Sequence, residues 1–189
     1  MPLAPEQPFT YADLLSRKDG QRYELWGGRL RAMSSPSDQH QAAALELGRQ
    51  FGNFLLGKPC NVYPAPFDVR LFEQEGEPPE AVDTVVQPDL LVVCDSAKVD
   101  RRGVHSAPDL VIEILSDSTR QADWREKLRL YQKAGAKEYW IADPVARFVA
   151  VHLLREGCYD PPVFYTRNAR VPSGLWEGFS VDLTTVFPE

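Results

Sequence analysis

Apolar and polar residues follow each other in blocks that predict alternating strands and helices. The two most apolar blocks, residues 88–94 and 108–115, are nearly continuous runs of leucine, valine and isoleucine. Such runs are typical of central strands that are covered on both faces. Apolar residues recur at helical spacing over residues 40–56 and again over 120–134, where Gly135 follows as a stop signal.

Shorter elements are expected around these blocks. Residues 10–18 predict a short helix with Thr10 as its N-cap, and residues 23–33 predict a β-hairpin turned by Gly27 and Gly28. Further strands are expected at 60–63, 67–72, 138–142, 147–154 and 163–166 and near Val171 and Phe179, with an acidic loop at 73–83 and a helix cap at 116–119. This order predicts a single α/β or α+β domain over residues 1–189, with a central mixed sheet flanked by helices.

Composition and charge narrow the class of protein. The chain has 189 residues, of which 43% are hydrophobic and 25% charged, as in ordinary globular proteins. No apolar run approaches the roughly 20 residues that cross a bilayer, and Met1–Thr10 does not have the pattern of a secretory signal. The net charge of −6 is unusual for a protein that binds nucleic acid, although local basic patches can persist within a negative total.

Three cysteines, Cys60, Cys94 and Cys158, are widely spaced and odd in number. This spacing argues against a disulfide framework and against a zinc site, which needs ligands in closely spaced pairs. Cys94 ends an apolar run and is expected to be a small buried hydrophobic residue. A reducing cytoplasm is the expected location.

Glu113 is the residue that points most directly to chemistry, because it lies within the apolar run Val-Ile-Glu-Ile-Leu. A buried carboxylate is costly unless it is paired or binds a metal. Strand alternation places Asp109, Val111, Glu113 and Leu115 on one face. The alternative to a functional role is a core salt bridge with a lysine or arginine of a neighbouring helix.

Asp89 opens the neighbouring apolar run, just as Asp109 opens the second one. If the two runs pair, Asp89 and Glu113 could converge on one Mg²⁺ ion, which prefers oxygen ligands and keeps several waters. A strand-start role is the alternative for Asp89, and Asp109 competes with it for the metal.

Lys127 falls within the apolar stripe formed by Trp124, Leu128 and Tyr131 on the helix after Glu113. A helix that packs on the sheet through this stripe would direct Lys127 toward the carboxylates. The alternatives are a lysine that extends to solvent and an ion pair with Asp123 four residues earlier. Two carboxylates, one metal and one lysine together suit phosphodiester hydrolysis.

Five segments in order then resemble one family: Tyr23–Gly28, Pro64–Val69, Gln87–Leu90, Ala107–Ser116 and Lys137–Pro144. Over residues 20–155 the chain is similar to the Uma2 family, bacterial restriction-type endonucleases with a PD-(D/E)XK core. The resemblance implies a restriction-endonuclease-like fold and metal-binding catalytic acids at Asp89 and Glu113. It also implies Glu24 as a further acid near the start of the core.

The chain departs from the family pattern at Leu115, where the core usually has a lysine two residues after the acid. Lys127 is therefore the expected replacement. His40 could border the site, but we expect it to be a solvated histidine at the start of a helix.

The function predicted from the sequence is a Mg²⁺- or Mn²⁺-dependent DNA endonuclease. Its sequence specificity would come from residues 73–86 or 95–106 or from a second subunit, and two-strand cleavage would favour a homodimer. Two alternatives remain open at this point. One is an inactive binding or assembly module with the same fold, and the other is a nuclease for RNA or branched DNA.

Overall fold

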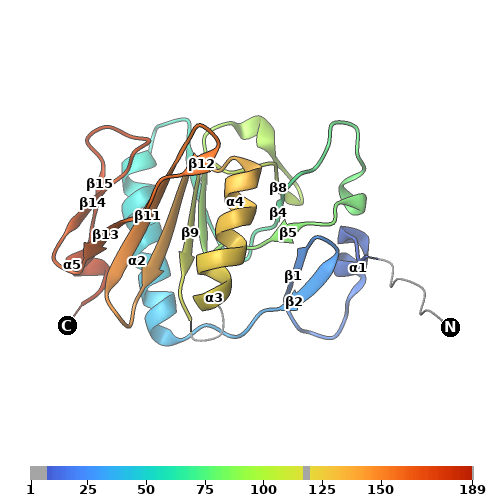
Figure 1. The fold of residues 1–189 in the computed structure, drawn as a ribbon, viewed down its shortest axis with the longest axis horizontal. Coiled ribbons are helices and arrows are strands. Elements are labelled where there is room, and N and C mark those ends of the chain that lie inside the picture. Colours follow the sequence, from blue (N-terminus) through green and yellow to red (C-terminus); the bar gives the residue numbers. More distant parts are fainter. Residues whose placement is uncertain (1–7, 117–119, 189) are drawn as a thin grey trace.

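The fold places two larger sheets and one small sheet among a few helices (Figure 1). A computed structural model describes residues 8–116 and 120–188. The helical segments are α1 (Tyr11–Ser16), α2 (Asp38–Leu55), η1 (Pro79–Ala81), η2 (Ser96–Lys98), α3 (Arg120–Ala122), η3 (Asp123–Lys127), α4 (Leu128–Ala134) and α5 (Leu183–Val186). The strands are β1 (Tyr23–Trp26), β2 (Arg29–Ala32), β3 (Asn61–Pro64), β4 (Val69–Arg70), β5 (Val85–Val86), β6 (Leu90–Val93), β7 (Val99–Asp100), β8 (Gly103–His105), β9 (Leu110–Ile114), β10 (Glu138–Asp143), β11 (Phe148–Arg155), β12 (Cys158–Tyr159), β13 (Val163–Thr166), β14 (Arg170–Pro172) and β15 (Ser180–Asp182).

The central sheet contains both of the strongly apolar runs. Its strand order is β12-β11-β10-β9-β6-β3, and β13 pairs with the first half of β11, from Phe148 to Val151. Strands β6 and β9 are antiparallel neighbours, with Leu90 opposite Ile112, whereas β9 and β10 are parallel. The expected mixed sheet is therefore confirmed, and the pairing of the two runs, which the sequence left open, is present.

Helices cover both faces of this sheet, as Figure 1 shows for α2 and α4. On one face Phe51 of α2 packs edge-on against Trp140, with ring centroids 5.4 Å apart. On the other face Tyr131 of α4 lies against Tyr139, with centroids 5.1 Å apart. Strands β6 and β9 are buried on both faces, which explains why they lack the polar alternation of half-exposed strands.

A second sheet, in the order β2-β1-β5-β4-β8-β7, carries the predicted hairpin. Gly27 and Gly28 have φ values of 54° and 74°, as the two-residue turn between β1 and β2 requires. The short strands β5, β7 and β8 were not expected. Each has only two or three residues and leaves little local pattern: β5 and β8 pair with β4, which is distant in the sequence, and β7 is an edge strand that pairs with β8.

Two expectations from the sequence need correction. The strand expected at 67–72 is only Val69–Arg70, because Phe72 has a φ of 65°, which strand geometry does not allow. The helix expected at 120–134 is present, but its middle, Asp123–Lys127, is a π-helical turn. Gly135 ends it with a φ of 90°, as expected, whereas residues 117–119 of its expected cap lie outside the described part of the chain.

Cys60 and Cys94 form a disulfide, so the expectation that the cysteines stay unpaired was wrong, as was that of Cys94 as a buried hydrophobic residue, since Cys94 is only partly buried. The two residues are 34 positions apart in the sequence, but they flank the antiparallel pair β3–β6, in which Asn61 lies opposite Val93. The pairing of the strands therefore brings the two sulfurs together. Cys158 is a free, exposed cysteine. Over residues 8–116 and 120–188, no helix combines the length and apolar character of a transmembrane span.

Candidate active site

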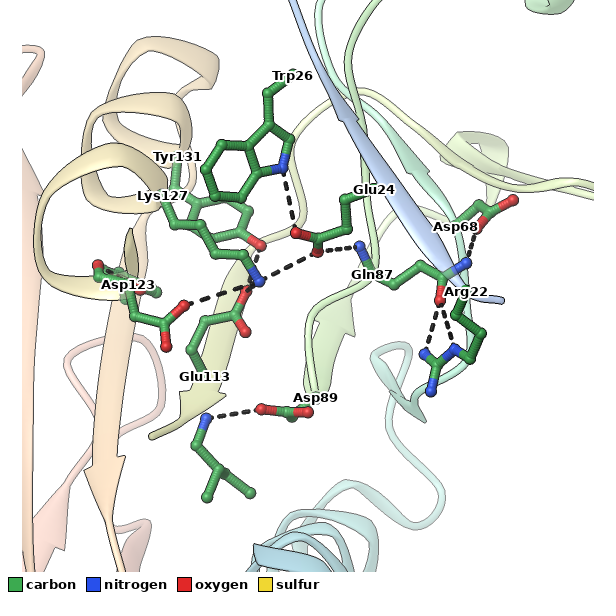
Figure 2. A network of polar contacts seen from close by, with 12 residues as sticks. Arg22, Glu24, Trp26, Asp68, Gln87, Asp89, Glu113, Asp123, Lys127 and Tyr131 are labelled. Atoms are coloured by element: carbon green, nitrogen blue, oxygen red, sulfur yellow. Dashed lines mark hydrogen bonds and ion pairs between the residues drawn. The ribbon is translucent and has the colours of Figure 1, made fainter. Parts of the chain in front are cut away.

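A cleft of about 510 Å³ lies between the β1–β2 hairpin, the first turn of α2, the ends of β6 and β9, and η3. The four acids and bases predicted from the sequence, Glu24, Asp89, Glu113 and Lys127, all line this cleft. They come from four different elements. Figure 2 shows them converging on one region.

Glu113 is buried on β9, with 3% of its surface exposed. Its Oε1 accepts hydrogen bonds from Lys127 Nζ at 2.9 Å and from the Tyr131 hydroxyl at 2.6 Å. Strand alternation turns Glu113 toward the face covered by η3 and α4, as predicted. Burial raises the pKa of Glu113, and the neighbouring carboxylates of Asp123, Asp89 and Glu24 add to this effect against the opposing attraction of Lys127.

Lys127 ends the π-helical turn and is 5% exposed, so the prediction of a lysine directed at the carboxylates is confirmed. Its Nζ lies 2.9 Å from Glu113 Oε1, 3.1 Å from Glu24 Oε1 and 3.8 Å from Asp123 Oδ1. Burial alone lowers the pKa of Lys127, but the attraction of these three carboxylates outweighs it and raises the pKa. The lysine is therefore a fixed positive charge. Single π-helical turns frequently occur at functional sites.

Glu24 is held in place from two sides. Its Oε2 accepts a hydrogen bond from the Trp26 indole at 3.1 Å, and its Oε1 accepts one from the backbone N–H of Gln87 at 2.8 Å. Because Gln87 precedes Asp89 by two residues, the same segment positions both acids. Glu24 is 4% exposed and shares Lys127 with Glu113.

Asp89 is anchored beside Glu113 across the β6–β9 pair. Its Oδ2 accepts a hydrogen bond from the backbone N–H of Ile114 at 2.7 Å and lies 3.2 Å from His40 Nε2. The expectation of a solvated His40 was wrong, since it is 8% exposed. Helix α2 begins at Asp38, and the backbone N–H of His40 donates to Ser37 Oγ, so the first helical turn directs the imidazole at Asp89.

Asp109, the competitor of Asp89, does not line the cleft. Its carboxylate accepts hydrogen bonds from Lys137 Nζ at 2.7 Å and from the backbone N–H of Cys94 at 2.8 Å. Burial raises the pKa of Asp109, but the two donors outweigh it and the net pKa is lowered. Asp109 thus forms an ion pair at the opposite end of β9 from the cleft.

Asp89 and Glu113 supply carboxylate oxygens, the kind of ligand that a hard cation prefers. Within the described residues, Asp89 Oδ1 and Glu113 Oε2 accept no hydrogen bond, whereas the second oxygen of each carboxylate is anchored. No group of three or more histidine, cysteine, aspartate or glutamate side chains in the described ranges could jointly hold a metal ion. Two carboxylates nevertheless suffice for Mg²⁺, which keeps several of its waters.

Several contributors were not recognised from the sequence. Tyr131 was assigned to the apolar stripe of its helix, but its hydroxyl binds Glu113. Gln87 gave no signal beyond its place before Pro88 and Asp89. None of residues 73–86 or 95–106, which were expected to supply specificity, lines the cleft. Leu115, in the usual lysine position, is buried in the core at 2% exposure.

Residues 9–184 match the model of a family described as "Putative restriction endonuclease", Uma2. The chain belongs to the Uma2 family. This Uma2 chain is also 28% identical over 134 residues to an uncharacterized protein from Synechocystis sp. (strain ATCC 27184 / PCC 6803 / Kazusa). That alignment covers 69% of the Uma2 chain and 65% of the relative's length.

A solved structure shares the fold of this Uma2 chain. It is the crystal structure of a protein from Anabaena variabilis ATCC 29413, described as a putative nuclease belonging to DUF820. The TM-score is 0.75 at 18% sequence identity, and the match covers 95% of the Uma2 chain and 98% of the other chain. The expected family and the mixed α+β fold are thereby confirmed.

Proposed function

We propose that this Uma2 chain is a metal-dependent endonuclease that hydrolyses phosphodiester bonds of DNA. One observation carries the proposal: Lys127, supplied by the helix after β9, reaches 2.9 Å from Glu113 on the cleft wall that also holds Asp89 and Glu24. This arrangement restores a lysine beside the acid although Leu115 occupies the usual position.

Asp89 and Glu113 would hold Mg²⁺ or Mn²⁺ through the carboxylate oxygens that accept no hydrogen bond from the described residues. When bound, the ion would lower the pKa of a coordinated water and neutralise charge on the scissile phosphate. Ile114 N–H and His40 keep the Asp89 carboxylate oriented, and the Tyr131 hydroxyl does the same for Glu113.

Lys127 would supply a positive charge next to the scissile phosphate, in addition to the charge of the metal ion. An ammonium in a site of low dielectric stabilises the negative charge that develops on phosphate oxygens, and it costs no reorganisation when it is already in place. Glu24 also contacts this ammonium, at 3.1 Å, and Trp26 and the Gln87 backbone in turn hold Glu24 in place.

The test is cleavage of supercoiled plasmid and of short duplexes in the presence of Mg²⁺, Mn²⁺ or EDTA. We expect cutting that needs the metal and that falls at least about 100-fold in Asp89→Asn, Glu113→Gln and Lys127→Met. Asp109→Asn is the matched control, because Asp109 also follows a proline at a strand start but lies outside the cleft. This variant should keep its activity.

The outcomes separate the competing functions. Loss of cutting in the two acid variants but not in Lys127→Met would support the nuclease function but exclude a catalytic role for Lys127. Absence of cutting by the folded wild-type chain on DNA, together with metal binding that needs Asp89 and Glu113, would favour the inactive binding module. Cutting of RNA or branched DNA alone would change the substrate class.

We also propose that the enzyme acts as a homodimer, because two-strand cleavage with one active site per chain favours an assembly of two copies. Analytical ultracentrifugation should give a dimer at working concentrations, and the plasmid should be linearised rather than only nicked. A monomer that releases nicked circles would contradict this assembly.

A further inference from the structure

Arg22 differs from Arg31 and Lys127, the other two cations of the cleft, because its hydrogen-bond partner is a neutral amide and not a carboxylate. Among the described residues, three lysine and arginine side chains line the cleft: Arg22, Arg31 and Lys127. Arg31 forms an ion pair with Glu126 at 3.2 Å, and Lys127 is bound by buried carboxylates. Arg22 is exposed and forms no ion pair with any carboxylate in the described ranges, so its charge is not neutralised within the protein.

The Arg22 guanidinium is nevertheless held in a defined position. Its Nε and Nη2 donate to Gln87 Oε1 at 3.2 and 2.6 Å, and Gln87 Nε2 donates to Asp68 Oδ1 at 2.6 Å (Figure 2). The other oxygen of Asp68 accepts a hydrogen bond from the hydroxyl of Tyr11, which is 1% exposed. The neutral amide oxygen of Gln87 therefore orients the arginine without cancelling its charge. The buried Tyr11 holds the far end of this chain of hydrogen bonds in place.

The same glutamine also links Arg22 to the acids. The backbone N–H of Gln87 donates to Glu24 Oε1 at 2.8 Å, and Asp89 follows two residues later. Arg22 is thus fixed relative to the carboxylates that would hold the metal. A guanidinium has five N–H donors in a planar fork, and here Nη1 makes no hydrogen bond to the described residues.

We propose that Arg22 binds a phosphate of the DNA strand next to the scissile bond. The inference rests on the proposed function, since it assumes that DNA enters the cleft. Two points support it. A chain of net charge −6, with five acidic side chains along its cleft, needs an unneutralised cation to attract a polyanion. Guanidinium also matches phosphate oxygens in geometry better than an ammonium does.

The experiment measures the affinity of a short fluorescent duplex as a function of salt, in EDTA and in Ca²⁺. Arg22→Gln should weaken binding by about tenfold and should reduce the slope of log affinity against log salt by about 0.9, the value for one phosphate contact. Arg29→Gln is the matched control. It removes the same charge from the first residue of β2, in the hairpin that begins directly after Arg22, but Arg29 does not line the cleft.

The result supports the inference if only Arg22→Gln changes both affinity and slope while its unfolding temperature stays that of the wild type. The inference is overturned if Arg22→Gln keeps the wild-type slope, if Arg29→Gln lowers it equally, or if the wild type binds no duplex. Binding that depends on Arg22 without any metal-dependent cutting would leave this inference standing and remove the proposed catalysis instead.

Discussion

Replacing Lys127 by methionine tests the electrostatics of the cleft independently of any enzymatic assay. Methionine keeps most of the length of the side chain but removes the ammonium that lies between Glu24, Glu113 and Asp123. The side chains of these acids are 5%, 4% and 1% exposed, so solvent screens their mutual repulsion only weakly once the cation is lost. Removing one partner of a buried ion pair costs about 3–5 kcal/mol, a large part of the typical stability of a domain.

The same variant should acquire a characteristic pH dependence. Without the attraction of Lys127 the pKa of Glu113 rises further, so that the folded state binds more protons than the unfolded state. Stability must then fall as pH rises, by about 1.4 kcal/mol per pH unit for each extra proton. The difference from the wild type should be smallest near pH 5, close to the unfolded carboxyl pKa, and should grow toward pH 8.

Urea unfolding at pH 5 and pH 8, followed by circular dichroism, measures this difference. Arg129→Met is the control, because Arg129 is exposed on α4 and its loss should change stability by less than about 0.5 kcal/mol. A Lys127→Met variant as stable as the wild type at both pH values would refute the idea that the Lys127 ammonium stabilises the buried acids of this cleft.

Three further predictions concern other contacts. Tyr131→Phe removes the 2.6 Å hydrogen bond to Glu113 and should lower the free energy of unfolding by about 2 kcal/mol, so an unchanged urea midpoint would contradict the buried contact. The hydrogen bond from Arg49 lowers the pKa of Glu46 to about 2, so this stabilisation is present above pH 4.5 and is lost as pH falls through 2. Glu46→Gln should therefore destabilise the protein, by on the order of 1 kcal/mol after solvent screening, at pH 7 but not at pH 2, as thermal unfolding at the two pH values can establish. Alkylation of the denatured, unreduced chain should label Cys158 alone, and prior reduction should expose all three cysteines, whereas three labels without reduction would rule out the disulfide.

Local pattern was sufficient for the main elements and for the principal site residues. Two apolar runs predicted two central strands, and helical spacing predicted α2 and the helix after β9. Glu113 could be singled out because a carboxylate inside an apolar run needs a partner. Lys127 could be assigned to the sheet-facing side of its helix because the helical period decides which residues share a face. The family resemblance then implied Glu24, which no local pattern marked.

Tertiary structure decided the contacts that depend on residues far apart in the chain. Asp89 and Asp109 have the same local sequence, and only the antiparallel register of β6 and β9 places one in the cleft and the other at the opposite end of the strand. The burial of His40 and the disulfide of Cys60 likewise follow from packing and strand pairing. Sequence patterns report the preferences of neighbours within a few residues, whereas these contacts are set by which surfaces the folded chain brings together.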